Sequence, residues 1–262
     1  MGSATRGAVL SARNVLADMP GVDFATAEGL FGAAGSLAGS MQLRSILTDS
    51  GRSVNEKAQI AQKVFGSRLT ESALNLILAA VSARWSSQDD LIAGIEQLAL
   101  RAAASSADAD IASELFQFGL AIQSDASLEF ALGSRTSAPA RKVELVQRLL
   151  SGKASAQTIA IVEHFVRSPG DRSVRESLDY ARSVVADQAG FAVATVYTAH
   201  QLNAPQVARL ERALSEKYDR GVRINQVIDA DVIGGFRVQI ADDVIDGSVA
   251  SRINDLRLQL AS

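Results

Sequence analysis

The stretch Val232-Ile-Gly-Gly-Phe-Arg-Val-Gln-Ile240 decides how the C-terminal part of this chain folds. Two adjacent glycines, Gly234 and Gly235, open a segment in which apolar and polar side chains alternate, the period of a half-buried strand. A turn, Asp246-Gly247-Ser248, then breaks the extended run. Apolar residues recur at helical spacing after the turn: Val249, Ile253, Leu256 and Leu260. We therefore predict a strand, a turn and a closing helix.

The segment that leads into this ending extends the pattern upstream. Residues 191–197 are rich in β-branched and aromatic side chains, as strands are. Asn203 is a good helix N-cap, and Pro205 fits the first turn of the helical pattern that follows. Apolar residues alternate again over 222–228. Residues 191–262 therefore predict a small α+β domain of order β-α-β-β-α.

The rest of the chain contains an internal repeat. When the sequence is compared with itself at a constant offset, Leu30 aligns with Leu115. The offset holds without gaps from Leu30 to Val81, which favours duplication over chance likeness of two Ala-rich segments. The matches include Leu30-Phe31 with Leu115-Phe116, Leu47 with Leu132, Lys57 with Lys142, Gln62 with Gln147 and Val81 with Val166. Each copy is expected to fold as one helical bundle.

Helix signals recur at matching places in both copies. In the first copy, Ser53 precedes Glu56 by three positions, the spacing of a capping box, and Gly66 ends the helix. In the second copy, Pro139 starts the equivalent helix and Gly152 ends it. Between the copies, an apolar face at helical spacing closes one bundle and opens the next: Leu91, Ile95, Leu98 and Ala102. We predict bundles at 1–90 and 91–190, before the domain at 191–262.

The composition agrees with a mainly helical protein. Of 262 residues, 47% are hydrophobic and only 5% are aromatic, and alanine is abundant. Small helix formers with few large rings favour tight helix bundles over a wide sheet. The net charge of −3 argues against nucleic acid as a partner, and the lack of cysteine excludes disulfides and thiolate chemistry. No stretch reads as a membrane span, so we expect any membrane attachment to come through partner subunits.

No group of residues has the pattern of a catalytic, cofactor or metal site. His164 and His200 lie in different predicted domains and lack metal-ligand spacing, so both are expected to be structural. Gly234-Gly235 is followed by no Lys-Ser/Thr pair and forms no GxGxxG motif, so a strand bulge is favoured over a phosphate loop. The acidic residues nearby fit an exposed hairpin better than a cation site: Asp242, Asp243 and Asp246.

Trp85, the only tryptophan, follows Arg84 between two predicted helices. The ring is expected to cover the end of the first bundle. The alternative is an anchor for a partner, because Trp and Arg are enriched at interface hot spots.

The ordered set of a glycine pair, an Asp-Gly-Ser turn and a final helix resembles the C-terminal signature of the delta subunits of F-type ATP synthases, the oligomycin-sensitivity-conferring protein family. From about Leu91 onward, the order of predicted elements resembles a complete delta subunit. Residues 1–90 then look like an additional bundle, as in the enlarged delta subunits of actinobacteria. Which copy takes the usual binding position stays open.

The resemblance implies a non-catalytic subunit of the peripheral stalk, or stator, of a proton-translocating ATP synthase, with one copy per complex at the cytoplasmic face of the bacterial plasma membrane. In that family the helical bundle receives N-terminal segments of α subunits, chiefly between its first and fifth helices. The C-terminal domain holds the end of subunit b. No cofactor, metal or active site is implied.

The resemblance also assigns candidate residues. For the α subunits, surfaces over 91–106 and 155–168 are expected, with these candidates: Leu91, Ile95, Leu98, Ile161 and Phe165. For subunit b, the candidates lie on the final helix: Val249, Ile253, Leu256 and Leu260. The structural motif of the C-terminal domain is expected at Gly234, Gly235, Asp246, Gly247 and Ser248. Two alternatives stay open: a soluble helical adaptor unrelated to ATP synthase, and an enzyme that holds phosphate at the glycine pair.

Overall fold

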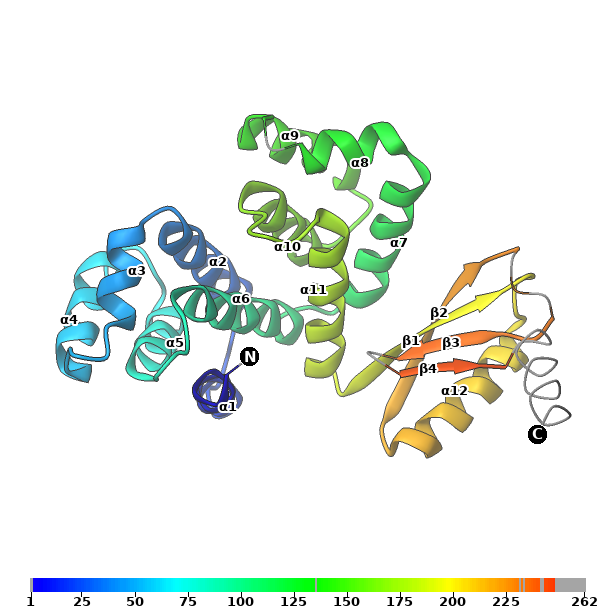
Figure 1. Ribbon diagram of the computed structural model, residues 1–262, viewed down its shortest axis with the longest axis horizontal. Coiled ribbons are helices and arrows are strands. Elements are labelled where there is room, and N and C mark those ends of the chain that lie inside the picture. The colour runs from blue at the N-terminus through cyan, green and yellow to red at the C-terminus, as the bar shows by residue number, and fades with distance from the viewer. Residues whose placement is uncertain (1, 135, 231, 233, 241–242, 248–262) are drawn as a thin grey trace, which may run out of the picture. The chain divides into compact units, whose positions relative to one another are not determined.

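The computed structural model describes residues 2–134, 136–230, 232, 234–240 and 243–247. The chain divides into two compact units: unit 1 is Met1–Val185 and unit 2 is Ala186–Ser262. The elements are mainly helices, with one small sheet in unit 2 (Figure 1). The predicted fold class, mainly α with a small α+β part, is confirmed.

Helices make up all the regular structure described for unit 1. In chain order they are α1 (Ser3–Ala17), α2 (Phe24–Ala38), α3 (Met41–Thr48), α4 (Val54–Phe65), α5 (Glu71–Ser82), α6 (Gln88–Ser105), α7 (Ile111–Ser124), α8 (Ala126–Gly133), α9 (Pro139–Leu150), α10 (Ala156–Arg167) and α11 (Val174–Gln188). Helix α6 packs against α1, α2, α3 and α5 on one hand and against α10 on the other. Helix α6 therefore contacts helices of both copies. The bundle boundary near residue 90 remains a prediction.

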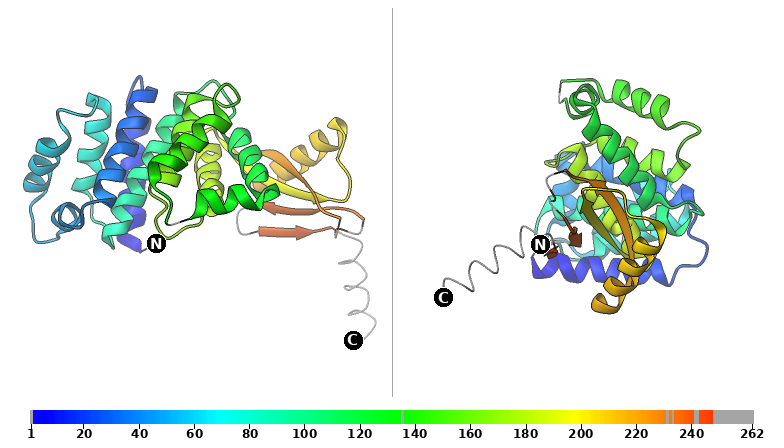
Figure 2. Two further views of the ribbon diagram at one scale, coloured as in Figure 1. Left: turned by 90° about the horizontal axis from the view of Figure 1, so that it is seen from above. Right: turned by 90° about the vertical axis from the view of Figure 1, so that its right-hand side faces the viewer.

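The repeat offset holds for whole helices. It carries α3, α4 and α5, from first residue to last, onto α8, α9 and α10, and it carries the start of α1 onto the start of α6. Figure 2 shows the helices of unit 1 from two further sides. The sequence analysis did not predict helix α1. Its buried residues recur at helical spacing, but most are small and make a weak apolar stripe: Thr5, Ala8, Ala12 and Leu16.

Two pairs of equivalent positions have the same burial in both copies. Leu47 and Leu132 are both fully buried. Lys57 and Lys142 are 7% and 5% exposed, an unusual environment for lysine that both copies keep. Burial lowers the pKa of Lys142, because the neutral amine tolerates loss of water better than the ammonium. The duplication thus includes the core as well as the helix order.

Side-chain caps explain where many helices begin. The predicted capping box is present at α4: Ser53 accepts from the amide of Glu56, and Glu56 accepts from the amide of Ser53. Other caps accept a hydrogen bond from a first-turn amide: Asp23, Ser40, Thr70, Ser87, Asp110, Asp125, Ser155 and Asn203. Pro139 is at the first position of α9, and Gly66 follows α4, as predicted.

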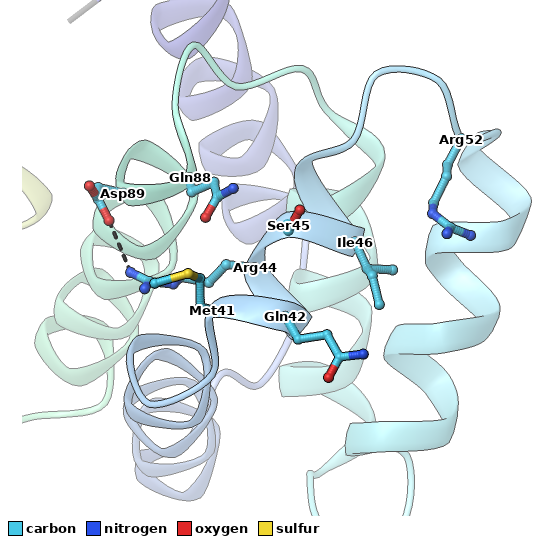
Figure 3. A pocket seen from close by; sticks show the side chains of 8 residues that line it. All are labelled: Met41, Gln42, Arg44, Ser45, Ile46, Arg52, Gln88 and Asp89. Atoms are coloured by element: carbon cyan, nitrogen blue, oxygen red, sulfur yellow. Dashed lines mark hydrogen bonds and ion pairs between the residues drawn. The ribbon is translucent and has the colours of Figure 1, made fainter.

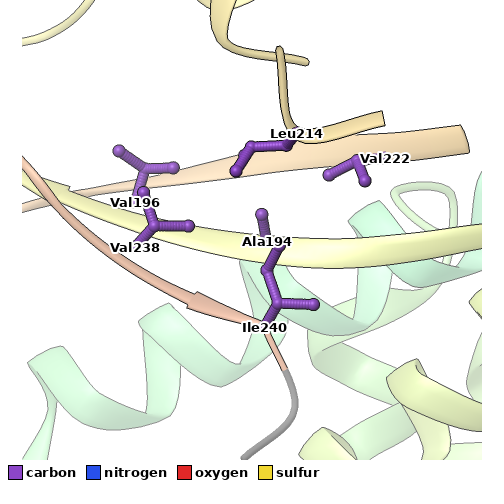
Figure 4. Close-up of a cluster of buried hydrophobic side chains, with 6 residues drawn as sticks. All are labelled: Ala194, Val196, Leu214, Val222, Val238 and Ile240. Atoms are coloured by element: carbon purple, nitrogen blue, oxygen red, sulfur yellow. The ribbon is translucent and has the colours of Figure 1, made fainter. Parts of the chain in front are cut away.

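Unit 2 contains a four-stranded sheet and one described helix beside it. Its elements are β1 (Phe191–Thr198), α12 (Ala204–Tyr218), β2 (Gly221–Ile228), β3 (Arg237–Ile240) and β4 (Asp243–Asp246). The strand order is β2-β1-β3-β4. Strands β1 and β2 are parallel and joined through α12, whereas β3 is antiparallel to both β1 and β4. Figure 4 shows the core between sheet and helix: Ala194, Val196, Leu214, Val222, Val238 and Ile240.

Strand β4 was not predicted. The sequence analysis expected an exposed acidic hairpin here, and the hairpin of β3 and β4 does expose Asp243 and Asp246. Residue Asp246 is the last residue of a strand. The predicted closing helix, with Ser248, Val249, Ile253, Leu256 and Leu260, lies outside the described residues, as does Asp242.

Candidate functional site

A buried polar pair joins the two copies of the repeat at α6 and α10. Nε2 of His164 in α10 lies 2.9 Å from Oε1 of Glu96 in α6. Their side chains are only 6% and 11% exposed. Because a buried carboxylate needs a partner, the pair fixes how α10 sits on α6. This agrees with the structural role expected for His164.

Helix α2 of the first copy covers this pair. The ring centroids of Phe31 and His164 are 4.8 Å apart, and Phe31 is 6% exposed. Gly35 of α2 lies close to Ser168, the residue that follows α10: a Cβ on Gly35 would lie 3.9 Å from Oγ of Ser168. Helix α2 packs along α6 and also touches α10. Helix α2 of the same chain therefore contacts both α6 and α10 at this pair.

The five residues expected to meet an α subunit are buried. Each is at most 2% exposed: Leu91, Ile95, Leu98, Ile161 and Phe165. The sequence analysis placed them on the correct helices, α6 and α10, but helical spacing cannot say whether an apolar face meets the chain's own core or a partner. The structure shows them as core, so any role in docking is through the shape of the surface above them.

Trp85 rests on α6. Its Nε1 donates a hydrogen bond to the carbonyl oxygen of Ala80 at 2.7 Å. A Cβ on Gly94 would overlap the ring, since the nearest ring atom would be 2.1 Å away. A residue without a side chain is thus needed at position 94. These contacts favour the covering role for Trp85 over the partner anchor.

A shallow hollow of about 990 Å³ lies between α3 and the start of α6 (Figure 3). Arg44 crosses it to Asp89, with Nη1 and Oδ1 3.1 Å apart. In the second copy, the position equivalent to Arg44 is Glu129, and Glu129 lies 3.8 Å from Arg175. Arg175 and Glu129 are half-exposed, so their pair contributes little to stability, whereas Arg44 is largely buried and Asp89 is exposed. The hollow is lined by Met41, Gln42, Arg44, Ser45, Ile46, Arg52, Gln88 and Asp89.

The glycine pair of unit 2 has a backbone conformation that other residues rarely adopt. Gly234 and Gly235 have φ values of 68° and 80°. Gly247 directly follows β4 and pairs with the residue before β3. Its amide donates to the carbonyl of Phe236 at 2.9 Å, and a Cβ on Gly247 would lie 3.2 Å from that oxygen. The motif therefore shapes the chain between β2 and β4. The structural role that the sequence analysis favoured for the glycines stays a prediction.

The face of the sheet away from the core residues carries stacked arginines. The guanidinium of Arg223 lies 4.1 Å from the ring centroid of Phe191, and that of Arg237 lies 4.7 Å from Tyr197. Arg237 also pairs with Asp229 at 3.4 Å. Such cation–π contacts hold the arginines flat on the sheet. Unit 2 thus offers a mixed polar and aromatic surface.

The described residues contain no group of three potential metal ligands of the His, Cys, Asp and Glu types. His200 is exposed, and the hydroxyl of Thr198 donates to its backbone carbonyl. Across the part of the chain that is described, no helix has the length and apolarity needed to cross a bilayer. The arrangement offers helix surfaces and a sheet face, which suit binding of protein segments.

Comparison with known proteins gives a consistent picture. Residues 96–260 match the family model described as ATP synthase delta (OSCP) subunit, and the match begins inside α6. A protein of Leifsonia xyli named ATP synthase subunit delta is 47% identical over the whole of both chains. One of Streptomyces avermitilis with the same name is 36% identical over 99% of this chain and 98% of its own. A third ATP synthase subunit delta, from Acidothermus cellulolyticus, is 39% identical over 84% of this chain and 82% of its own length.

Proposed function

The chain belongs to the ATP synthase delta (OSCP) subunit family, whose members are peripheral-stalk subunits of F-type ATP synthases, and we propose that it links the α subunits of the catalytic head to subunit b. The observation that carries the proposal is full-length similarity to a delta subunit, including the first copy of the repeat. The alternative of an adaptor unrelated to ATP synthase has no support from the comparisons.

The two units suit two attachments. Unit 1 is one compact array of capped helices, and unit 2 has a separate core of its own. Linking two binding modules raises the effective concentration of the second contact once the first has formed. An attachment of nanomolar affinity corresponds to about −12 kcal/mol. Slow dissociation and a stiff helical body then resist the torque of the rotor.

On the α-subunit side, we propose that N-terminal segments of α dock on unit 1. Ala-rich helices leave shallow grooves that accept amphipathic helices. The proposal keeps the predicted surface over α6 and α10 as a docking site. Its buried residues act indirectly, because they set the separation of the helices: Leu91, Ile95, Leu98, Ile161 and Phe165. Because these residues are buried, direct contact falls to exposed residues of unit 1.

On the stalk side, we propose that unit 2 and the residues after it bind the C-terminal end of subunit b. Gly234 and Gly235 support the binding indirectly through the backbone that they permit. The predicted direct contacts remain Val249, Ile253, Leu256 and Leu260.

The subunit itself carries out no catalysis in this proposal. It is present once per complex and is held at the cytoplasmic face of the plasma membrane by its partners. The proton current and ATP synthesis belong to other subunits. The role of this chain is to stop the head from turning with the rotor.

Removing the chain from the assembled enzyme tests the proposal. We expect membranes stripped of this subunit to lose ATP-driven proton pumping, while the released head still hydrolyses ATP. Adding back the full chain restores pumping. Full pumping by membranes that lack the chain, checked by immunoblot, would reject the stator role.

A further inference from the structure

Strand β2 is the longer of the two edge strands in the sheet of unit 2. Among the described residues it pairs with β1 on one side, and the other side of its backbone, its outer edge, faces away from the sheet (Figure 1). It has eight residues, against four for β4 at the opposite edge. The outer edge of a strand is a template for pairing with another strand, and a longer edge offers more of it.

The sequence of β2 favours such pairing. Residues 221–228 include four β-branched apolar residues, one charged residue, Arg223, and no proline. Segments rich in β-branched residues and poor in charge add readily to other strands. The opposite edge is protected by its short length and by the exposed carboxylates at its two ends, Asp243 and Asp246. The residues of β2 supply neither protection themselves.

The amides of β2 point alternately towards β1 and towards the outer edge. Asp229, which directly follows β2, donates from its amide to the carbonyl oxygen of Thr198 in β1 at 2.9 Å. The amides of odd-numbered residues therefore face β1. Those at the outer edge belong to the even-numbered residues: Val222, Ile224, Gln226 and Ile228.

Two side chains of α12 accept hydrogen bonds from the first two of these amides. The amide of Val222 donates to Oγ of Ser215 at 3.0 Å. The amide of Ile224 donates to Oε1 of Glu211 at 3.1 Å. Residues four apart on a helix share a face and are about 6 Å apart along its axis. Amides two residues apart in a strand are about 6.6 Å apart. Because these spacings match, one face of α12 serves successive amides of the edge.

The series stops after two amides, because α12 has an apolar residue at the next position. One turn before Glu211 the helix carries Val207, which has no acceptor. The side chain of Gln226 accepts instead from the amide of Leu202, at 2.8 Å, in the loop between β1 and α12. Ile228, at the end of the strand, is 59% exposed. The side chains of α12 thus cover the first half of the outer edge and leave the second half.

We propose that Glu211 and Ser215 block the addition of a second copy of this chain to β2. Strand addition draws its affinity from main-chain hydrogen bonds. An incoming strand finds the amides of Val222 and Ile224 already bonded, so half of the donors of the edge are taken. Without the block, two β2 strands would pair antiparallel about a two-fold axis and join two sheets into one.

The same two hydrogen bonds also help to fasten α12 to the sheet, and the two roles differ in what they predict. Leu214, the residue before Ser215, is buried in the core of unit 2 and holds the helix independently. If fastening were the whole role, loss of the two bonds would lower stability and leave the oligomeric state unchanged. Blocking predicts that the folded chain self-associates once the bonds are lost.

The test uses the full-length chain with Glu211→Ala and Ser215→Ala combined. Glu211→Gln is the conservative variant, because its amide oxygen still accepts from Ile224. Glu216→Ala is the matched control, which removes a carboxylate from an exposed position of α12. Circular dichroism and urea unfolding show that each variant is folded. Sedimentation equilibrium measures dimerisation, and hydrogen exchange follows the amides of Val222 and Ile224.

We expect the double variant to dimerise at least about tenfold more tightly than wild type, because two further edge amides become available for pairing. The amides of Val222 and Ile224 should exchange slowly in that dimer. Glu211→Gln and Glu216→Ala should sediment as wild type does. Ile228→Lys, added to the double variant, places a charge on the edge and should reverse the gain.

A folded double variant that stays as monomeric as wild type overturns the inference, and so does a dimer in which the amides of Val222 and Ile224 exchange fast. If the double variant does not fold, Glu211→Ala alone is compared with Glu211→Gln. Tighter dimerisation of the alanine variant then supports the block, and equal sedimentation of the two rejects it. None of these outcomes bears on the stator role.

Discussion

Thr5 of α1 donates a hydrogen bond from Oγ1 to Oδ2 of Asp90 in α6 at 2.8 Å, and the two residues are 85 positions apart, the offset of the repeat. The first helix is thus tied to the helix that is its own counterpart. The amide of Ser86 donates to the same Thr5 oxygen at 3.1 Å. Thr5 is 1% exposed, so these bonds form out of water. They hold α1 in place despite its small side chains.

Thr5→Val should therefore loosen α1. The substitution keeps the shape but leaves the Ser86 amide without its acceptor, and an unmade bond of this kind costs about 1–2 kcal/mol. Urea unfolding and hydrogen exchange of α1 amides measure the effect. Ser11→Ala, at an exposed position of the same helix, is the control. Equal stability of the two variants would show that the bond does not anchor α1.

The chain's two histidines make a matched pair for testing the junction between copies. His164→Ala leaves the Glu96 carboxylate buried without its partner, and we expect a loss of about 3 kcal/mol in the free energy of unfolding. His200 is exposed, so His200→Ala should change it by less than about 0.5 kcal/mol. Chemical denaturation measures both. If the two losses agree within error, the pair is not a structural tie.

The capping box of α4 predicts a dependence on pH. The backbone amide of Ser53, followed by its hydroxyl, donates to Glu56 and holds the pKa of that carboxyl below its ordinary value. Because the folded pKa is lowered, the stability from this carboxylate is present above the ordinary pKa and is lost as the pH falls through the folded pKa. Ser53→Ala removes the hydroxyl, so the pKa of Glu56 should rise.

A carbon-13 titration of the Glu56 carboxyl by NMR follows this pKa. The exposed neighbour Ser50 gives the control, Ser50→Ala, for which we expect the wild-type titration. The account of the cap is wrong if Glu56 titrates at the same pH in the Ser53 variant and in wild type.

Gly235→Val should destabilise unit 2 first and weaken binding of subunit b second. The φ of 80° at Gly235 is strained for any residue with a Cβ, by about 1–2 kcal/mol. Asn adopts this region more readily, so Gly235→Asn should be the milder variant. Thermal unfolding and titration with the soluble part of b measure both effects. A valine variant with full thermal stability but no b binding would mean that Gly235 acts in the interface itself.

Much of the fold could be predicted because local signals agreed with it. The Ser53 cap, the Pro139 start and the Asn203 cap all stand where the structure begins a helix. Helix α1 escaped prediction because Ala8 and Ala12 give little apolar contrast. Strand β4 escaped because a four-residue edge strand with acidic ends, Asp243–Asp246, reads as a turn.

The candidate site was harder to predict, for a physical reason. Leu91 and Ile161 lie on the expected helices, but both are buried, and the helices packed on α6 include α2, which comes from a distant part of the sequence. Glu96 and His164 are 68 positions apart, and no local pattern joins them.

Cross-linking of the complex purified from native membranes through a tag on this chain tests the central claim most directly. The stator account predicts that mass spectrometry finds α, β and b subunits with the chain, with cross-links from α to residues 1–185 and from b to residues 186–262. Recovery of the chain without α and b, from membranes whose ATP synthase is intact and coupled, would contradict the account.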